Sequence, residues 1–325
     1  MGTMTIAKAI NNGLRAAMER DPKVVLMGED IGKLGGVFRV TDGLQKDFGE
    51  DRVIDTPLAE AGIVGTAIGM ALRGYRPVVE IQFDGFVYPG FDQIVSQVAK
   101  LHYRSQGDVK MPITIRIPFG GGIGAVEHHS ESPEAYFAHT AGLRVVACSN
   151  PVDAYYMIQQ AIACDDPVVF FEPKRRYWEK AELDTTLTPD PLFTSRVLRE
   201  GTDATVLAYG PMVRVALDAA VAAEKSDGRS LEVIDLRTLS PLDLDPVIAS
   251  VKKTGRAVVV TEAPREVSLA SEIAAEITER AFYALEAPVA RVTGYDIPYP
   301  PSRLEEEYLP DLDRVLDAVD RTFAW

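Results

Sequence analysis

Glu60 is the residue of this chain best placed for acid–base chemistry. A strand-like run, Arg52 to Asp55, precedes it, and Pro57 stops the strand because proline cannot donate to a ladder. Small and apolar residues from Ala61 to Leu72 then predict a helix. Junctions of this kind line the ligand crevice of open α/β sheets, and a poorly solvated carboxylate there can act as an acid or base. The alternative is a first-turn glutamate that only complements the helix dipole.

A histidine pair is the second candidate. The chain has four histidines, and His128 and His129 are adjacent, shortly after the glycine-rich run from Phe119 to Gly124. No apolar helix follows this run and no acidic residue closes a dinucleotide-binding unit, so we do not expect a Rossmann site. Neighbouring loop residues tend to point apart and no third ligand is obvious, which disfavours a metal. A mobile loop that carries histidines over a cleft fits better.

Two further features bear on binding. Phe86 follows the strand-like run from Val78 to Phe83, where an aromatic residue either fills the core or provides a platform for a flat ring. Gly62, Gly65 and Gly69 fall near one face of the helix after Glu60. Each costs about 1 kcal/mol relative to alanine, so we expect a second helix to pack close to them. That helix belongs either to the same domain or to another subunit.

Composition narrows the classes of function. A chain of 325 residues is long enough for two domains, and its net charge of −14 argues against nucleic acid and anionic membranes as partners. Cys148 and Cys164 lack metal-type spacing and are expected to be buried thiols in a reducing compartment rather than a disulfide. The longest apolar run is too short to span a bilayer, and no secretory signal is visible. We therefore expect a cytoplasmic protein.

Short apolar strands alternate with helical segments along the chain, which predicts an α/β protein with mainly parallel sheets and flanking helices. A stretch rich in Thr, Pro and Asp interrupts the alternation, so we expect domains at 1–185 and 193–325 with a linker at 186–192. Strands are expected at 24–27, 52–55, 78–83, 113–117, 143–147, 168–171, 204–209, 231–236, 257–261 and 289–292. Helices are expected at 6–20, 61–72, 89–103, 151–163, 212–225, 244–253, 268–285 and 304–323.

Eight motifs together resemble the beta subunit of the decarboxylating component of thiamine-diphosphate-dependent 2-oxo acid dehydrogenase complexes. They are GED from Gly28, DTPLAEAGIVG from Asp55, EIQF from Glu80, PGFDQIV from Pro89, HSESPEAYFAH from His129, FFEPK from Phe170, VIDLRTLSPLD from Val233 and VVTEAP from Val259. EIQF, SPEAYFAH and FFEPK are most similar to the branched-chain 2-oxo acid members, whereas pyruvate and acetoin relatives share much of the rest.

The resemblance implies a pyrimidine-binding domain followed by a transketolase C-terminal domain, in an α2β2 heterotetramer that acts on a 2-oxo acid and passes the acyl group to a lipoyl acyltransferase. Glu60 is implied to hydrogen-bond the pyrimidine N1′ of thiamine diphosphate, with Phe86 stacking on the ring and Leu58, Gln82 and Glu29 nearby. His129 is implied to assist at the substrate and lipoyl end.

Metal binding is also implied by the resemblance. The chain has no Gly-Asp-Gly triplet, so the alpha subunit is implied to hold Mg²⁺ and the diphosphate. A potassium ion is implied near five residues, with Cys164 standing where the family usually has Asp: Ile113, Ala161, Ile162, Cys164 and Asp166. The alternatives to the branched-chain enzyme are a pyruvate or acetoin enzyme and a catalytically silent scaffold.

Overall fold

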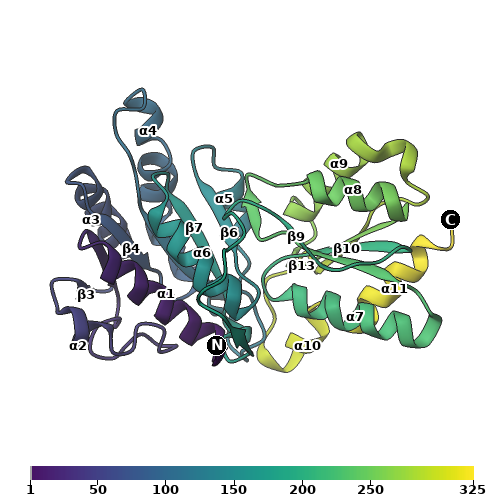
Figure 1. Ribbon diagram of the computed structural model, residues 1–325, viewed down its shortest axis with the longest axis horizontal. Helices are drawn as coiled ribbons and strands as arrows, with labels where there is room; N and C mark the ends of the chain where they lie inside the picture. Colours follow the sequence, from purple (N-terminus) through teal and green to yellow (C-terminus); the bar gives the residue numbers. More distant parts are fainter. Residues whose placement is uncertain (1) are drawn as a thin grey trace. The chain divides into compact units, whose positions relative to one another are not determined.

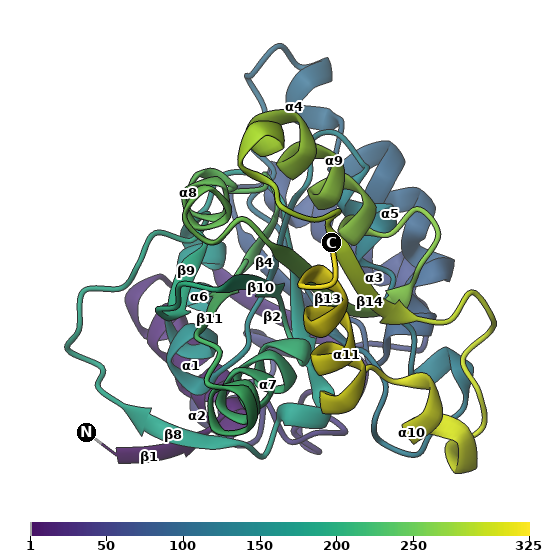
Figure 2. The same ribbon diagram turned by 90° about the vertical axis from the view of Figure 1, so that its right-hand side faces the viewer.

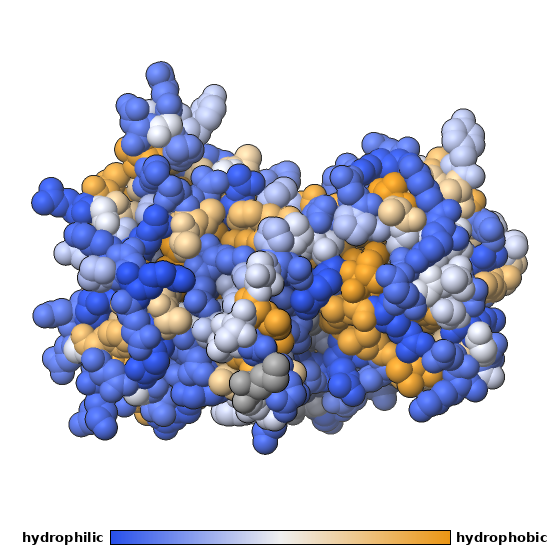
Figure 3. Space-filling model, in the orientation of Figure 1, coloured by the Kyte–Doolittle hydropathy of each residue, from blue (hydrophilic) through white to orange (hydrophobic). Residues whose placement is uncertain are grey.

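The computed structural model describes residues 2–325, which form two compact units (Figure 1). Unit 1 comprises the residues up to Phe119 together with Tyr136–Leu192, and unit 2 comprises Gly120–Ala135 and Phe193–Trp325. The glycine loop that carries the histidine pair is therefore grouped with the C-terminal part of the chain. The face shown in Figure 3 is mostly hydrophilic, with smaller apolar patches between the polar side chains.

Unit 1 is built on parallel strands in the order β6-β7-β5-β4-β2-β3, and a separate antiparallel pair joins β1 to β8. The central strands are buried along their whole length, as expected for a parallel sheet covered by helices on both faces. The strands are β1 (Gly2–Thr5), β2 (Val24–Gly28), β3 (Val53–Asp55), β4 (Arg76–Glu80), β5 (Thr114–Phe119), β6 (Arg144–Ala147), β7 (Val168–Pro173) and β8 (Lys180–Leu183).

Helices of unit 1 follow the predicted periodicity in most places. Thr5 caps α1 by accepting a hydrogen bond from the Lys8 backbone amide, and Asn150 caps α6 in the same way through Asp153. The helices are α1 (Ile6–Arg20), α2 (Leu44–Phe48), α3 (Glu60–Leu72), η1 (Asp84–Gly90), η2 (Gln93–Val98), α4 (Leu101–Arg104), α6 (Pro151–Ala163) and η4 (Lys174–Arg176).

Unit 2 has a five-stranded sheet in the order β14-β13-β10-β11-β9, with only β9 antiparallel to its neighbour. Helices α8 and α9 lie on one face and α7 and α11 on the other, as Figures 1 and 2 show. The strands are β9 (Arg196–Arg199), β10 (Ala204–Ala208), β11 (Leu231–Asp235), β12 (Thr238–Ser240), β13 (Ala257–Pro264) and β14 (Ala290–Gly294). The helices are η3 (Glu127–His129), α5 (Glu134–Ala138, which straddles the two units), α7 (Met212–Asp227), α8 (Asp245–Thr254), α9 (Leu269–Ala281), η5 (Phe282–Ala284), η6 (Ser302–Leu304), α10 (Glu305–Tyr308) and α11 (Leu312–Thr322).

The predicted α/β class with mainly parallel sheets is confirmed, but three predicted elements are wrong in extent. The helix predicted over 89–103 is three short segments, η1, η2 and α4, because Pro89 and the glycines around it prevent a regular start. Pro310 divides the helix predicted over 304–323 into α10 and α11. Strand β4 ends at Glu80 rather than Phe83. No helix within residues 2–325 is long and apolar enough to cross a membrane.

Candidate active site

Three neighbouring strands bring the candidate residues of unit 1 to one edge of its sheet. β2 pairs with both β3 and β4, and Gly28 at its end lies opposite Asp55 on one side and Glu80 on the other. Carboxyl ends of parallel strands meet at the same edge, so the residues that follow each strand come together there. The Thr56 backbone amide donates to the Gly28 carbonyl at 2.9 Å, which closes the turn between β3 and α3 onto β2.

Glu60 begins α3, as the sequence predicts, and its residue is only 7% exposed. Its carboxylate has no hydrogen bond or ion pair to any residue of the described chain, 2–325. Gly90 of η1 lies directly against the backbone of Glu60, because a Cβ built at Gly90 would be 3.3 Å from the Glu60 carbonyl oxygen. The carboxylate oxygens of this otherwise buried residue are not among the fully buried polar atoms without a partner, so they reach solvent and are suited to bind a group that the chain does not itself supply.

Glu29 follows β2 and lies close enough to Glu60 for the charge of Glu60 to change the pKa of Glu29. Burial raises the pKa of the Glu29 carboxyl, and the negative charges of Glu60 and then Asp30 raise it further. The edge therefore holds two carboxyl groups, and the charge of Glu60 affects the protonation of Glu29. Paired carboxyl groups of this kind are typical of sites that hold or move protons.

Aromatic side chains surround the turn after β4. Phe86 in η1 is half-buried and packs edge-on against Phe83, with ring centroids 5.9 Å apart. Phe83 in turn meets Phe38 at 5.4 Å. Gln82 is half-buried between these elements, and Leu58, in the turn before Glu60, is 73% exposed. These two side chains lie on elements that border Glu60 and Phe86, but Leu58 does not pack into the chain's own core.

A buried ion pair anchors the segment that carries Phe86. Asp84 begins η1 and Lys174 follows β7; their side chains are fully buried and form an ion pair. The Lys174 ammonium also lies 5.8 Å from the centre of the Phe83 ring. Because a buried charge requires an opposite charge nearby, this pair fixes the start of η1 to the sheet.

A second buried cluster supports the same edge from within the sheet. Arg116 of β5 donates from Nε and Nη2 to the two carboxylate oxygens of Glu172 at 2.6 and 2.8 Å, and from Nη1 to Glu80. Tyr177 donates to Glu172 at 2.6 Å. Burial and the charge of Glu172 raise the pKa of Tyr177 well above its ordinary value, which keeps its hydroxyl a donor. Bidentate contacts of this kind fix strands β4, β5 and β7 relative to each other.

His129 lies in unit 2, on the glycine loop, whereas the other candidate residues are gathered in unit 1. Two carboxylates hold the loop backbone. Gly121 donates its amide to Glu262 at 3.0 Å, and Gly122 donates to Glu305 at 2.8 Å. Gly120 has φ of +84°, a conformation that other residues rarely adopt. The loop thus has a defined path, fixed by side chains of β13 and α10.

The histidine pair is stacked at the end of this loop. The rings of His128 and His129 are 4.5 Å apart, with His129 the more buried of the two. His128 also contacts Glu127, with Nδ1 3.4 Å from the carboxylate. Within residues 2–325, no group of three or more His, Cys, Asp and Glu residues could hold a metal ion.

Oxygen atoms of the five residues implied for potassium accept hydrogen bonds within the chain. The carbonyl oxygens of Ile162 and Cys164 both accept hydrogen bonds from Nη1 of Arg76, at 3.1 and 3.0 Å. Arg76 Nη2 also donates to Asp165 at 2.7 Å. A guanidinium therefore already supplies the positive charge at these two carbonyls.

The remaining three oxygen donors are also engaged. The Ile113 carbonyl accepts from the Val168 amide at 2.9 Å in the β5–β7 ladder, and the Ala161 carbonyl accepts from Cys164 at 3.2 Å. Asp166 accepts from Arg144 at 3.0 Å. A carbonyl oxygen has two lone pairs, so these hydrogen bonds do not test the potassium ion that the resemblance implies, and it stays a prediction. Both cysteines are free thiols; Cys148 is buried, as the sequence predicts, whereas Cys164 is only half-buried.

Comparisons with known proteins place this geometry in a family. Residues 2–179 match the family "Transketolase, pyrimidine binding domain" and residues 194–315 match "Transketolase, C-terminal domain". The "Pyruvate dehydrogenase E1 component subunit beta" of Leifsonia xyli subsp. xyli is 65% identical over 324 residues, covering 99% of this chain and 96% of that protein. The "3-methyl-2-oxobutanoate dehydrogenase subunit beta" of Mycobacterium tuberculosis is 54% identical, covering 98% and 92%.

The chain belongs to the E1 beta subunits of 2-oxo acid dehydrogenases. Its predicted resemblance is thereby confirmed at the level of the family, and the enzymes of this family are oxidoreductases that depend on thiamine diphosphate. A solved chain described as "Split gene transketolase, inactive beta4 tetramer" has a TM-score of 0.79 and 22% identity, and covers 99% of each chain. That likeness supports the fold.

Several residues of this E1 beta chain that shape the site were not assigned from the sequence. Asp84 and Lys174 are separated by 90 positions, and only the strand order brings them together. Lys174 is the last residue of the motif FFEPK. The motif indicated that Lys174 is important, but it did not indicate that its partner is Asp84. Glu262 lies in the motif VVTEAP, but neither it nor Glu305 was assigned to the glycine loop from the sequence.

Proposed function

We propose that this chain is the beta half of a 2-oxo acid decarboxylase component and binds the aminopyrimidine side of thiamine diphosphate. The observation that carries the proposal is Glu60, a residue only 7% exposed at the start of α3, whose carboxylate has no partner in the described chain. A carboxyl group in this setting can donate a hydrogen bond to, and exchange a proton with, a ring nitrogen such as N1′. The half-buried ring of Phe86 supplies a flat apolar surface beside it.

When bound, thiamine diphosphate supplies the nucleophilic carbon and the electron sink for loss of carbon dioxide. The residues of this chain hold and orient its pyrimidine ring. Glu60 exchanges the proton at N1′, and Phe86 restricts the ring plane. Glu29, whose carboxyl pKa is raised by burial and by Glu60, keeps a second proton-holding group at the same edge. Gln82 and Leu58 border the ring from the neighbouring turns.

An alpha subunit completes this site in the proposal. The chain lacks the Gly-Asp-Gly triplet of a magnesium and diphosphate site, so the alpha subunit holds Mg²⁺ and the diphosphate in an α2β2 heterotetramer. The glycine face of α3 is open: Gly62 and Gly69 are exposed, and a Cβ at Gly69 would meet nothing within 4 Å. A face this apolar and this open is suited to a subunit contact.

His129 acts at the entrance in this scheme, where the acyl group passes to lipoyl-lysine of the acyltransferase. We place the pyrimidine-binding domain at 1–185, the linker at 186–192 and the C-terminal domain at 193–325, in a cytoplasmic enzyme. The potassium ion implied by the resemblance stays part of the proposal, and Nη1 of Arg76 donates to two of its five proposed ligands, the carbonyls of Ile162 and Cys164.

The substrate we propose is a branched-chain 2-oxo acid. The motifs EIQF, SPEAYFAH and FFEPK favour this class, and the relative from Mycobacterium tuberculosis is named for 3-methyl-2-oxobutanoate. Pyruvate is the second candidate, favoured by the name of the 65% identical relative from Leifsonia xyli.

The test is to purify the chain together with its alpha subunit and to measure decarboxylation with an artificial electron acceptor. Thiamine diphosphate and Mg²⁺ are added at saturation. We expect a higher kcat/KM on 3-methyl-2-oxobutanoate than on pyruvate. The reverse order would assign the enzyme to pyruvate. A stable heterotetramer that binds thiamine diphosphate but is inactive on both acids would make the chain a silent scaffold.

A further inference from the structure

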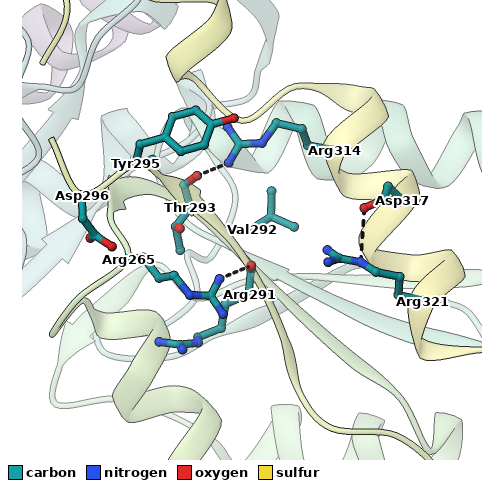
Figure 4. Close-up of a pocket in the computed structure, with 10 residues that line it drawn as sticks. Arg265, Arg291, Val292, Thr293, Tyr295, Asp296, Arg314, Asp317 and Arg321 are labelled. Atoms are coloured by element: carbon teal, nitrogen blue, oxygen red, sulfur yellow. Dashed lines mark hydrogen bonds and ion pairs between the residues drawn. The ribbon is translucent and has the colours of Figure 1, made fainter. Parts of the chain in front are cut away.

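Unit 2 contains a basic pocket at the carboxyl ends of β13 and β14 (Figure 4). Its volume is about 240 Å³. Charged side chains dominate the lining: Arg265, Arg291, Arg314, Arg321, Asp296 and Asp317. Ligands of parallel α/β sheets bind at this end of the strands. The excess of arginine is a local feature, because the whole chain carries a net charge of −14.

Arg265 and Arg291 are at the centre of the positively charged lining of the pocket. Their side chains lie side by side in Figure 4, and Arg265 Nη1 donates to the Arg291 carbonyl at 3.2 Å. Arg291 Nη1 donates to the Ser271 hydroxyl at 2.6 Å. Neither guanidinium has a carboxylate within 4 Å anywhere in residues 2–325. Burial and the charge of Arg265 lower the pKa of Arg291, which reflects two like charges held together.

The other charged groups of the pocket leave this excess uncompensated. Arg314 donates to the carbonyls of Thr293 and Tyr308 and stacks on Tyr295, 4.8 Å from the ring centre. It has no carboxylate partner in the described chain. Only Arg321 is neutralised, by Asp317 at 3.2 Å one turn earlier on α11.

Asp296 faces the same pocket but is already engaged as an acceptor. It receives the backbone amide of Glu266 at 2.8 Å, and it forms no ion pair with Arg265 or Arg291. Three guanidinium groups without an ion pair in residues 2–325 therefore line this pocket, and the charge of Asp296 offsets only part of their excess.

We propose that this pocket binds a small ligand through a phosphate-class dianion. The planar fork of a guanidinium matches the oxygens of phosphate, and two neighbouring forks can share one phosphate group. A dianion compensates both Arg265 and Arg291, whereas a monocarboxylate would leave one of them without a counter-charge. The small volume suits the free ion or a compact phosphate ester rather than a large cofactor. None of its residues takes part in the decarboxylation proposed above.

The test uses the purified full-length chain and inorganic phosphate as the probe, with binding followed by ³¹P NMR or calorimetry at constant ionic strength. We expect saturable binding that Arg265→Gln and Arg291→Gln each weaken by roughly tenfold or more, the loss expected for a charge-assisted contact. Arg265→Lys, which keeps the charge but loses the fork, is expected to weaken binding less. Acetate at the same ionic strength is expected not to compete.

Arg280→Gln is the matched control, because Arg280 lies on α9, pairs with Asp245 and is outside the pocket. It is expected to leave phosphate affinity unchanged. Absence of saturable binding, equal loss in the control, or competition by acetate would overturn the proposal. The titration is repeated on the heterotetramer saturated with thiamine diphosphate and Mg²⁺. Loss of binding there would mean that a partner subunit's own carboxylate fills the pocket, which also overturns it.

Discussion

At the scale of single residues, the chemistry proposed for unit 1 depends on two carboxyl groups, one after β2 and one at the start of α3. Glu60 is buried without a partner, and Glu29 senses its charge. Neither contributes to stability through a bond of its own in the described chain, and burying a carboxylate without compensation is unfavourable. Residues that lower the stability of the fold and lie at the carboxyl ends of its strands are expected to bind a ligand.

Glu60→Gln is expected to abolish most decarboxylation while the chain stays folded. Glutamine has a similar shape and can hydrogen-bond, but it cannot release a proton, and loss of a positioned acid–base group costs on the order of a hundredfold or more. The measurement is kcat of the heterotetramer with an artificial electron acceptor. Glu50→Gln is the control, since Glu50 is exposed in the turn before β3. Turnover close to that of the control would refute the role of Glu60.

Glu29→Gln is expected to stabilise the chain at neutral pH and much less in acid. The folded-state pKa of Glu29 is raised above its ordinary value of 4.5, so its contribution to stability is present below that value and is lost as pH rises through the raised pKa. Glutamine mimics the protonated form at every pH. Urea unfolding of both proteins between pH 4 and 7.5 measures the difference, which should grow with pH; a difference that shrinks with pH would contradict the assignment.

The position of Glu60 between a strand and a helix could be predicted from the sequence, because the residues on both sides of it carry local signals. Pro57 ends the strand and the apolar run after Glu60 predicts the helix. The approach of Glu29 to Glu60 was not readable, because it depends on β2 lying between β3 and β4. Strand order is a property of the whole sheet, and no local pattern in the chain specifies it.

At the scale of elements, the segment from Asp84 to Arg104 shows how backbone restrictions shape the site. An apolar pattern predicted one helix, but Pro89 and the neighbouring glycines leave three short segments. Short helices have little intrinsic stability, so tertiary contacts must hold them. For η1 those contacts are the buried Asp84–Lys174 pair and the close approach of Gly90 to Glu60.

Lys174→Met is expected to destabilise the chain by about 3–5 kcal/mol, because Asp84 then loses the cation that compensates its buried charge. The double variant with Asp84→Asn should recover part of this loss, since no buried charge remains. Urea unfolding of the single and double variants provides the measurement. Lys180→Met, at an exposed position of β8, is the control. A double variant less stable than Lys174→Met alone would show that the pair does not act as a unit.

At the scale of the whole molecule, the chain has one open apolar helix face and, in the proposed function, one half of a cofactor site. It has no Gly-Asp-Gly triplet, and α3 exposes Gly62, Gly69 and Leu72. Both features indicate that activity depends on assembly. The chain alone is therefore expected to bind thiamine diphosphate poorly and to decarboxylate nothing, even with added Mg²⁺.

Gly69→Leu is expected to prevent co-purification with the alpha subunit while the isolated chain keeps its thermal unfolding transition. The larger side chain has open space within the chain, since nothing lies within 4 Å of a Cβ at Gly69. Ala275→Leu, at an exposed position of α9, is the control for an added leucine. Circular dichroism and affinity co-purification report the two properties. If the isolated variant is destabilised but still assembles normally, the glycine face of α3 packs inside this chain and not against the alpha subunit.

The grouping of the glycine loop with unit 2 also has a consequence for how the protein is made. Residues 120–135 leave the ribosome well before Glu262 and Glu305, the carboxylates that hold the loop backbone. Synthesis proceeds at about 5–20 residues per second, so on the order of ten seconds pass between synthesis of the histidine loop and synthesis of Glu262 and Glu305. During that interval its glycines are without these partners and accessible to proteases. A nascent chain released after residue 192 would carry His129 on an unanchored loop, so the loop acquires its fixed path only when synthesis is nearly complete.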